Sequence, residues 1–557
     1  MSTSRSAPKR LADWGAFALV ALVYLIVATR EIALPGIYMD AVNPDYLVTR
    51  WLNPDAQSIP PWVPLGNDLL NRYPVLVGFH HGSLQLWLGY PAYFVFGMTV
   101  AGLRLTHAMF GLGVLAALYG MLRTTRLPRT WAVAAGVVLA LDPSFVYAFR
   151  TSSYITMAPV ALLLLAVVCI EKARASEGRA RDRWLLACGG LGGLAIWGYF
   201  IYAFFVPALM IAAWVTGPRG QPPRARIRQL AMLGAGLAAG GSGYAIGYAL
   251  FAYSAGGIAA AWGHVIAAQP GLGLAGVTVP LAARIEHIWT VWQMVVSNAW
   301  NHARIFHDAD PTWDAGWKFK LLVGAPPVLW LALEAQRRAP PILRLLLGLE
   351  LAFLCSALAF GTRLGGHHFT PLVPLSYAAL ACALRALGAG AKRPVAAAAA
   401  GAAALGAVAV LATVNVAGDA HTLDALRLTG GVGYYSDAIN HLGADLLAGD
   451  HHRLLVFPDW GLYMPTAFLT HATMEMAAHD DYALARRRLC EGKDVVVALI
   501  TGDRGARFRD WQQRLDWGTP GVVAYRQRNG RVAFEVATFA GQDAAARCGT
   551  EAAAPSR

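Results

Sequence analysis

Residues 34–52 read LPGIYMDAVNPDYLVTRWL and begin where the first long apolar segment of the chain ends. Two aspartates, Asp40 and Asp45, stand five positions apart among aromatic and aliphatic residues. Because Pro-Gly at 35–36 and Asn-Pro at 43–44 break any helix, we predict that both acids lie on a short exposed loop. A carboxylate beside apolar residues at a membrane edge is costly to keep charged, which favours a functional role over chance.

This stretch therefore offers two candidates for the catalytic base of a membrane enzyme. We predict that Asp40 is the base, with Asp45 as the second candidate. The alternative, that both are solvated loop carboxylates next to helix ends, stays open at this point.

The composition places the chain in a membrane. Of its 557 residues, 56% are hydrophobic and only 14% are charged, whereas about a quarter are charged in an average soluble protein. Its mean hydropathy is +0.44. The formal net charge of +13 does not indicate a nucleic-acid partner. The excess Lys and Arg stand between apolar segments, as in the cytoplasmic loops of membrane proteins.

The apolar segments predict a polytopic α-helical membrane protein with about eleven transmembrane helices. The first segment follows Arg5, Lys9 and Arg10 and is long enough to span, so we interpret it as an uncleaved helix and not as a signal peptide. The expected spans are 12–30, 100–122, 131–148, 155–171, 184–198, 200–216, 229–253, 318–334, 343–361, 368–386 and 395–415.

The basic residues predict the orientation of these spans. With a cytoplasmic N-terminus, every inside loop is basic, for example 123–129, 172–183 and 219–228, while the outside loops hold only scattered positive residues. Such an excess marks the cytoplasmic side. An odd number of spans then places the C-terminal region on the other side, which is the periplasm if the membrane is a bacterial cytoplasmic membrane.

Two outside loops, 31–99 and 254–317, are long and form a membrane domain of residues 1–415 together with the spans. In the first loop, DYLVTRWL and LQLWLGYPAYFVFG are apolar enough to lie in the membrane interface as amphipathic helices. In the second loop, the Trp-rich RIEHIWTVWQMVVSNAWNHARIF suits an interfacial helix with tryptophans at headgroup depth.

Residues 416–557 are predicted to form a small soluble α/β domain outside the membrane. LLVF, VVVALI, GVVAYR and RVAFEVATF have the pattern of strands, and DYALARRRLC and RFRDWQQRLDW have the pattern of helices. Cys490 and Cys548 are the only cysteines of this region. In an oxidising compartment these two residues are able to form a disulfide.

Three stretches of the membrane domain, taken together, resemble the GT-C class of membrane glycosyltransferases. They are PGIYMDAVNPDY, YPVLVGFHHGSLQLWLGYPAYFVFGMTVAGLRLTHAMFGLG and DPSFVYAFRTSSYITMAPVALLLLA. Within the class the chain is most similar to the bacterial branch of aminoarabinose transferases, protein O-mannosyltransferases and Rgt-type lipopolysaccharide sugar transferases. One departure matters: the frequent Asp-Glu pair is here Asp40-Ala41, which raises Asp45 as a substitute.

The resemblance implies both a donor and a reaction. A sugar on a polyprenyl phosphate would be transferred, with inversion, to a cell-envelope glycolipid, polysaccharide or protein on the outer side of the cytoplasmic membrane. One carboxylate would take the acceptor proton within hydrogen-bond reach. Desolvation at the membrane surface would raise the pKa of Asp40 toward the working pH. Membrane lipids are the other expected partners.

The leaving lipid phosphate needs positive charge or hydrogen-bond donors, which we expect from the outer turns. The candidates are Arg150, Arg363, His367, His368 and Arg304 for the phosphate, and His80, His81 and Tyr154 for the acceptor or the cavity. Plainer roles stay open, because an Arg at a span end commonly reaches for lipid phosphate. A divalent metal ion near Asp40 and Asp45 also stays open, although no histidine spacing supports a metal site.

Other classes of function fit the sequence less well. A transporter or flippase of lipid-linked sugars is the main alternative, but we find neither paired halves nor charged or broken helices near mid-membrane. A polysaccharide polymerase or ligase would carry its long outer loop late in the chain, whereas here the long loops follow the first and seventh spans. A sensor or scaffold with a periplasmic domain is the plainest alternative.

Overall fold

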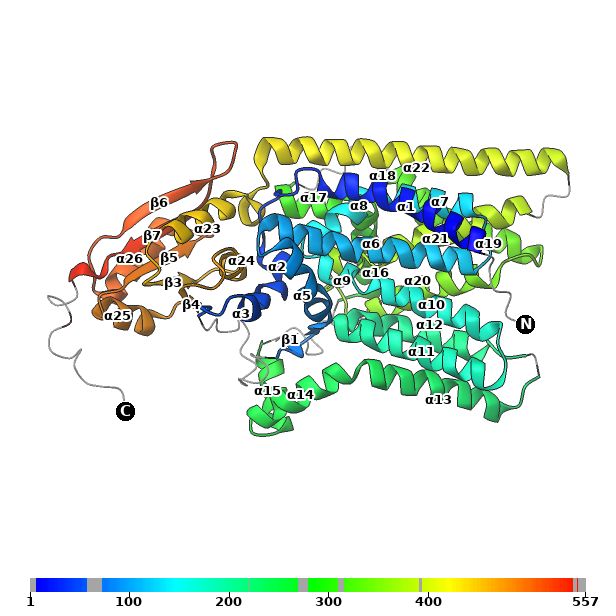
Figure 1. Ribbon diagram of the computed structural model, residues 1–557, viewed down its shortest axis with the longest axis horizontal. Helices are drawn as coiled ribbons and strands as arrows, with labels where there is room; N and C mark the ends of the chain where they lie inside the picture. The colour runs from blue at the N-terminus through cyan, green and yellow to red at the C-terminus, as the bar shows by residue number, and fades with distance from the viewer. Residues whose placement is uncertain are drawn as a thin grey trace.

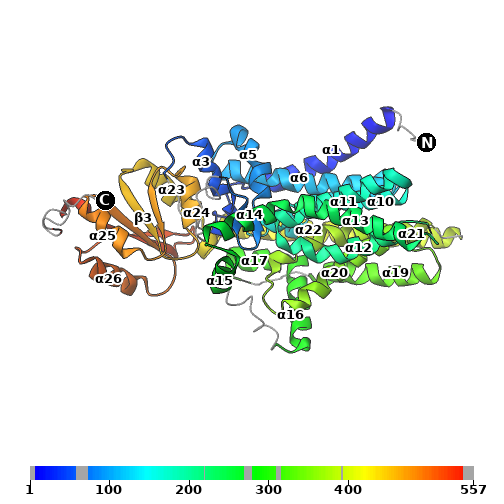
Figure 2. The same cartoon turned by 90° about the horizontal axis from the view of Figure 1, so that it is seen from below.

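The computed structural model describes residues 7–57, 73–218, 220–268, 279–308, 315–389, 393–543 and 548. A bundle of long helices lies along the long axis of the molecule, and a smaller α/β domain lies at one end of this bundle (Figures 1 and 2). The chain starts at the opposite end of the bundle. One end of the bundle therefore faces the α/β domain, and the other end lies near the start of α1.

The bundle is formed by helices in the predicted apolar segments. They are α1 (Ala7–Thr29), α6 (Val100–Thr124), α7 (Arg129–Ala140), α8 (Pro143–Val146), α9 (Tyr154–Met157), α10 (Val160–Arg174), α11 (Gly178–Gly198), α12 (Val206–Trp214), α13 (Pro223–Gly240), α14 (Ser242–Ser254), α18 (Ala315–Phe319), α19 (Ala325–Ala335), α20 (Pro341–Ala359), α21 (Leu372–Ala389) and α22 (Pro394–Thr429). Their inward faces share one hydrophobic core, except that α14 packs in a separate small cluster with Leu76 and Phe79.

Fewer of these helices than predicted meet the requirements of a membrane span. Among the described residues six are long and apolar enough, or up to eight if the two bent pairs, which join α7 to α8 and α13 to α14, each form one span. The expected count of about eleven is too high on this criterion. The segments 184–198, 200–216 and 318–334 are helical but fall short. Segment 184–198 belongs to α11, whose first turns are rich in arginine. Segment 200–216 contains the short α12. A π-helical turn at 320–324 interrupts segment 318–334.

Residues 31–99, which we predicted as the first outer loop and continue to call by that name, contain short elements that pack at the domain-facing end of the bundle. They are α2 (Met39–Val42), a 3₁₀ turn (Asp45–Val48), α3 (Thr49–Leu52), the hairpin of β1 (Leu76–Gly78) and β2 (His81–Gly82), and α5 (Leu84–Phe96). Helices thus occur in both stretches where we predicted interfacial ones. The exposed Leu88, Phe94 and Val95 on α5 suit a membrane interface.

The second outer loop is also helical where the structure describes it. It contains α15 (Ile258–Ala268), α16 (Leu281–Val296) and α17 (Ala299–Phe306). On α16, Ile288 and Trp292 are buried while Ile285 and Trp289 are exposed, so an apolar surface remains on its outer side, as predicted for an interfacial helix. Residues 269–278 and 309–314 of this loop lie outside the described part of the chain.

The α/β domain contains a mixed five-stranded sheet in the order β4-β3-β5-β7-β6. Parallel pairing joins β3 to β4 and β5, and antiparallel pairing joins β7 to β5 and β6. The predicted strands are confirmed as β3 (Arg453–Phe457), β5 (Asp494–Leu499), β6 (Gly521–Arg526) and β7 (Val532–Phe539), and the predicted helices as α25 (Tyr482–Cys490) and α26 (Arg504–Leu515). We did not predict β4 (Glu475–Ala478).

The two faces of this sheet have different partners. Leu454 and Val456 of β3 pack with α25 and α26, while Leu455 and Phe457, which point the other way along the strand, pack with α23 (Ala438–Ala448) and α24 (Tyr463–Leu469). The hydrophobic core on the α23 and α24 side of the sheet also includes most of the apolar residues between positions 37 and 48 of the first outer loop. The α/β domain therefore shares a hydrophobic core with the loop that carries Asp40.

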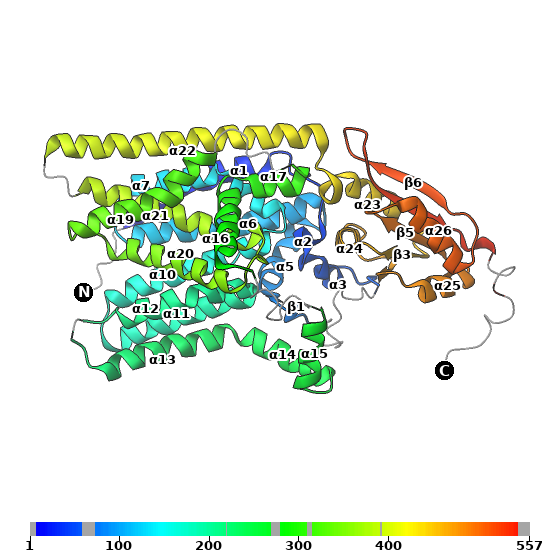
Figure 3. The same ribbon diagram turned by 180° about the vertical axis from the view of Figure 1, so that it is seen from behind.

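A long helix leads from the bundle to the α/β domain, and a disulfide links two cysteines of the domain. The long α22 extends past the expected domain boundary at 415 to Thr429 and runs along the bundle to the domain (Figure 3). Cys490 and Cys548 form a disulfide with Cα atoms 5.7 Å apart, a pairing that the sequence left open.

Candidate active site

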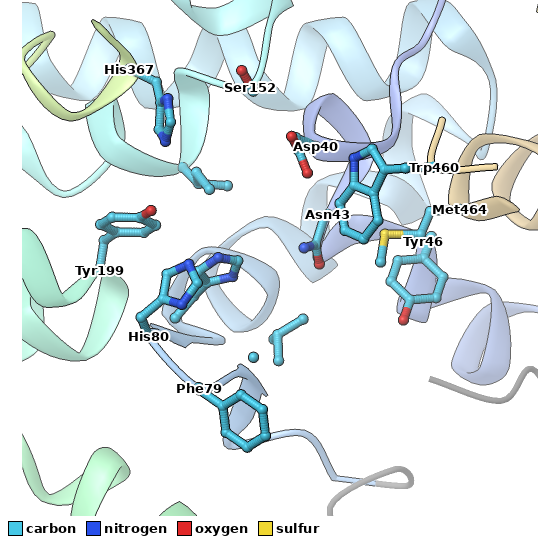
Figure 4. Close-up of a pocket in the computed structure, with 14 residues that line it drawn as sticks. Asp40, Asn43, Tyr46, Phe79, His80, Ser152, Tyr199, His367, Trp460 and Met464 are labelled. Atoms are coloured by element: carbon cyan, nitrogen blue, oxygen red, sulfur yellow. The ribbon is translucent and has the colours of Figure 1, made fainter. Parts of the chain in front are cut away.

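A cavity of about 220 Å³ lies where the bundle, the first outer loop and the α/β domain meet (Figure 4). Asp40 lies on one side of this cavity, and histidines and Tyr199 lie on the other. The residues that line it are Asp40, Asn43, Tyr46, Val77, Gly78, Phe79, His80, His81, Ser152, Ile155, Tyr199, His367, Trp460 and Met464.

Asp40 stands on the single turn of α2, which the two predicted helix breaks delimit. Its side chain is half-buried and hydrogen-bonds with Tyr38 and Trp460. Burial raises the pKa of Asp40 to about 6, although the Arg304 guanidinium and these hydrogen bonds act in the opposite direction. A carboxyl group with this pKa is mostly ionised at neutral pH and still basic enough to accept a proton.

Arg304, a predicted phosphate ligand, lies beside Asp40 but does not line the cavity. Its guanidinium carbon is 5.5 Å from the ring centroid of Tyr38 and 5.9 Å from that of Trp300. Arg304 also hydrogen-bonds with Tyr38. The arrangement places a positive charge next to the carboxylate, with Tyr38 in contact with both.

Two pairs of adjacent histidines approach the cavity from distant parts of the chain. His80 and His81 follow β1, and His367 and His368 form a 3₁₀ turn before α21. The ring of Tyr199 lies between the pairs, with its centroid 5.2 Å from that of His81 and its hydroxyl 3.2 Å from Nε2 of His368. Burial lowers the pKa of His80 and of His368 to about 4, so both imidazoles are neutral at neutral pH.

Asp45 has different surroundings from Asp40. It is fully buried and accepts hydrogen bonds from the hydroxyls of Tyr93, at 2.7 Å, and of Tyr154. Nε2 of His107 lies 3.5 Å from the same carboxylate. The prediction that Asp45 lies on an exposed loop is therefore wrong, because tyrosines from two other segments enclose it. Tyr154, predicted as an acceptor or cavity residue, does not line the cavity.

Two arginines predicted to bind phosphate also lie away from the cavity lining. Arg363 is exposed. Arg150 is 3% exposed and donates hydrogen bonds to the main-chain carbonyls of Ala28 (2.6 Å), Arg30 (2.6 Å), Leu34 (3.0 Å) and Glu31 (3.2 Å). The last carbonyls of a helix have no partner within that helix. Arg150 therefore provides hydrogen-bond donors for the carbonyls at the end of α1 and at the start of the first outer loop.

The sequence left open a divalent metal ion near Asp40 and Asp45. Among the residues that the structure describes, no group of three or more His, Cys, Asp or Glu is placed to hold a metal ion. Asp40 faces the cavity, whereas Asp45 is held by tyrosines. A metal ion shared by these two aspartates finds no support in this geometry.

The α/β domain contributes a part of the cavity that we did not predict. Trp460 and Met464 follow β3, at the carboxyl end of a strand with parallel neighbours. Ligand sites of parallel sheets commonly lie at this edge. The stretch FPDWGLYM after a predicted strand was the available signal. Tyr199 was missed as well, in the aromatic segment GYFIYAFF between α11 and α12.

A polytopic helical domain whose first long loop presents an acid to a cavity next to a C-terminal α/β domain is the arrangement that the resemblance to GT-C membrane glycosyltransferases implies. Among solved structures, ArnT from Cupriavidus metallidurans in the apo state is similar, with a TM-score of 0.56 and 15% identity over 95% of this chain and 98% of that one. The same protein bound to undecaprenyl phosphate gives a TM-score of 0.52 and 14% identity over 97% and 99%.

These comparisons confirm the predicted resemblance at the level of the fold. The sequence matches no protein-family model and no curated protein. The likeness extends over the membrane domain and the α/β domain together, since nearly the full length of both chains is covered.

Proposed function

We propose that the protein is an inverting glycosyltransferase that moves a sugar from a polyprenyl phosphate to a cell-envelope acceptor, with Asp40 as the general base. The observation that carries the proposal is the half-buried carboxylate of Asp40 in a cavity at the outer-loop end of a GT-C fold. One of the similar structures holds undecaprenyl phosphate, which supports a lipid-phosphate donor.

The residues around the cavity suit a direct displacement. Among the described residues that line it, Asp40 is the sole carboxylate. The acceptor hydroxyl would give its proton to Asp40 while its oxygen bonds to the anomeric carbon. The bond from that carbon to the phosphate oxygen breaks, and its electron pair leaves with the lipid phosphate. A lining without a second carboxylate offers no nucleophile of that kind for a covalent sugar intermediate, which agrees with inversion.

The wall opposite Asp40 would receive the leaving phosphate. His80, His81 and His367 line this wall, and a neutral imidazole donates one hydrogen bond. Such donors stabilise developing negative charge without protonating the leaving group. Arg304, near Asp40, adds a positive charge at the same end of the protein. Arg150 and Arg363 have no place in this proposal, because neither reaches the cavity lining.

We propose a bacterial cytoplasmic membrane as the location, with a cytoplasmic N-terminus and a periplasmic α/β domain. Arg123 and Arg129 pair with Asp13 near the start of α1, so this basic loop lies at the bundle end opposite the α/β domain. Basic loops mark the cytoplasmic side. The disulfide in the α/β domain suits an oxidising compartment.

The test is sugar transfer by the purified protein in detergent. Radiolabelled polyprenyl-phosphate sugars would serve as donors, and envelope lipids, glycans and proteins as acceptors. We expect label to move to an acceptor and the product linkage to have the opposite anomeric configuration from the donor. Donor movement across liposomes without any transfer would overturn the proposal in favour of a lipid-linked sugar transporter.

A further inference from the structure

The loop between β3 and α24 brings a side chain of the α/β domain to Asp40. It has the sequence Pro458-Asp459-Trp460-Gly461, and Trp460 lines the cavity. The indole of Trp460 hydrogen-bonds with Asp40 and also with Tyr38. Figure 4 shows the indole nitrogen turned toward the Asp40 carboxylate. A residue of the C-terminal α/β domain, far from Asp40 in the sequence, thus contacts the proposed base.

The turn that carries Trp460 is held rigidly by its neighbours. The Asp459 carboxylate accepts hydrogen bonds from the main-chain N–H of Ile500 (2.8 Å) and of Thr501 (3.1 Å), and from Arg507 (2.7 Å). Gly461 has φ +143°, and a Cβ there would lie 2.7 Å from Cδ1 of Tyr434. Only glycine fits this position. These contacts hold the main chain on either side of Trp460 in place.

We propose that Trp460 is a positioning residue through which the α/β domain orients the Asp40 carboxylate for proton transfer. The inference rests on the proposed function. It gives the α/β domain a role in the reaction, because this domain completes the site instead of only covering it. A carboxylate whose one side is fixed by an indole N–H keeps its free lone pairs directed into the cavity, where the acceptor hydroxyl would lie.

The hydrogen bond has a second consequence that an experiment can measure. A donor to the ionised form favours that form, so the indole lowers the pKa of Asp40 against the effect of burial. Among the described residues, the other charged or titratable groups around Asp40 are Arg304, Tyr38, Tyr199 and Tyr435, and Tyr46, His80, His81 and His367 line the same cavity. All of these remain when only the indole N–H is removed.

The experiment compares Trp460→Phe with Trp511→Phe in the full-length enzyme. Trp511 is a matched control, because its indole also donates to a carboxylate of the α/β domain, that of Asp480, at 3.1 Å, away from the cavity. For Trp460→Phe we expect kcat to fall about tenfold or more, since a hydrogen bond to a charged group is lost. The donor KM should stay near the wild-type value. The acidic limb of the kcat/KM profile should move to higher pH.

The result that overturns the inference is a Trp460→Phe enzyme with wild-type kcat and acidic limb, or an equal loss in Trp511→Phe. Thermal unfolding of each variant checks that the fold is kept. A second measurement does not depend on transfer. The infrared band of the protonated Asp40 carboxyl, assigned with Asp40→Asn, should have a higher midpoint pH in Trp460→Phe. If wild type transfers no sugar, the proposed function fails, while this titration still decides whether Trp460 acts on Asp40.

Discussion

Tyr93 donates a 2.7 Å hydrogen bond to the carboxylate of Asp45, and both side chains are buried. The hydroxyl of Tyr154 donates to the other carboxylate oxygen. Asp45 therefore joins the stretch that carries Asp40 to α5, which lies later in the same loop, and to α9. The two acids of one short stretch have separate tasks in this structure, one holding the loop and one facing the cavity.

Asp45→Asn should destabilise the protein and leave the chemistry intact. Removing the anionic acceptor of two buried hydroxyls is expected to cost about 1–3 kcal/mol. Thermal unfolding in detergent measures this loss, and kcat per folded molecule should stay within a few-fold of wild type. A large fall in kcat with unchanged stability would instead make Asp45 the base.

Asp40→Asn should have the opposite pattern. It keeps the shape of the side chain and removes the proton acceptor, so the transfer rate should fall by about 10²- to 10⁴-fold. The unfolding temperature at neutral pH should not fall, because burial disfavours the charged carboxylate. Asp55→Asn, which removes an exposed acid of the same loop, is the control and should keep wild-type transfer. Full activity of Asp40→Asn would refute the assignment of the base.

The pH dependence of transfer follows from the pKa of Asp40, which burial raises from 3.8 to about 6. The base must be ionised, so kcat/KM should rise through about pH 6 and level off above it. The folded state binds this proton more tightly than the unfolded state, so its contribution to stability is present below pH 3.8 and is lost as the pH rises to about 6. Unfolding temperatures of wild type relative to Asp40→Asn should therefore be higher at pH 5 than at pH 7.5.

Lys318 and Asp142 form an ion pair inside the bundle, with Nζ and Oδ1 2.6 Å apart and the side chains 2% and 0% exposed. Lys318→Met would leave a buried acid unpaired, at an expected cost of about 3–5 kcal/mol. The double variant Lys318→Met/Asp142→Asn should recover most of that loss in thermal unfolding. Arg344→Met, which breaks an exposed pair with Glu334, should change stability by about 0–1 kcal/mol. A loss of stability in Arg344→Met as large as that in Lys318→Met would contradict the prediction.

The disulfide is expected to stabilise the α/β domain. It links residues 58 apart, and closing a loop of this length in the unfolded chain corresponds to about 4 kcal/mol in the chain-entropy estimate. Cys490→Ser should therefore lower the unfolding temperature of this domain, whereas replacement of the exposed free Cys355 by Ser should not. A non-reducing peptide map that shows free Cys490 in the wild-type protein would contradict the pairing itself.

Predictions from local patterns were confirmed most fully. Four strands and two helices of the α/β domain occur at the predicted stretches, because alternation along a strand and apolar spacing along a helix are visible in consecutive residues. The count of spans was less accurate. An apolar run such as 200–216 shows that a segment is buried, but does not show whether one unbroken helix is long enough to cross a membrane.

Residues that lie at chain turns were harder to interpret. Arg150 was predicted to bind phosphate, since it stands between two apolar segments on the outer side. The structure shows that carbonyls at the end of α1 surround its guanidinium. Nothing in the residues adjacent to Arg150 indicates this contact, because its partners lie more than a hundred positions earlier in the chain.

By itself the sequence determined that this is a polytopic membrane protein with a C-terminal α/β domain, a GT-C resemblance and an acidic stretch after the first apolar segment. Composition, apolar segment length and basic-loop distribution carry that information because they reflect the cost of placing each residue in lipid or in water. Only the tertiary structure decided that Asp40 faces the cavity, that Asp45 does not, and that Trp460 lines the same cavity. These outcomes depend on a hydrophobic core shared between distant segments, which no local pattern specifies.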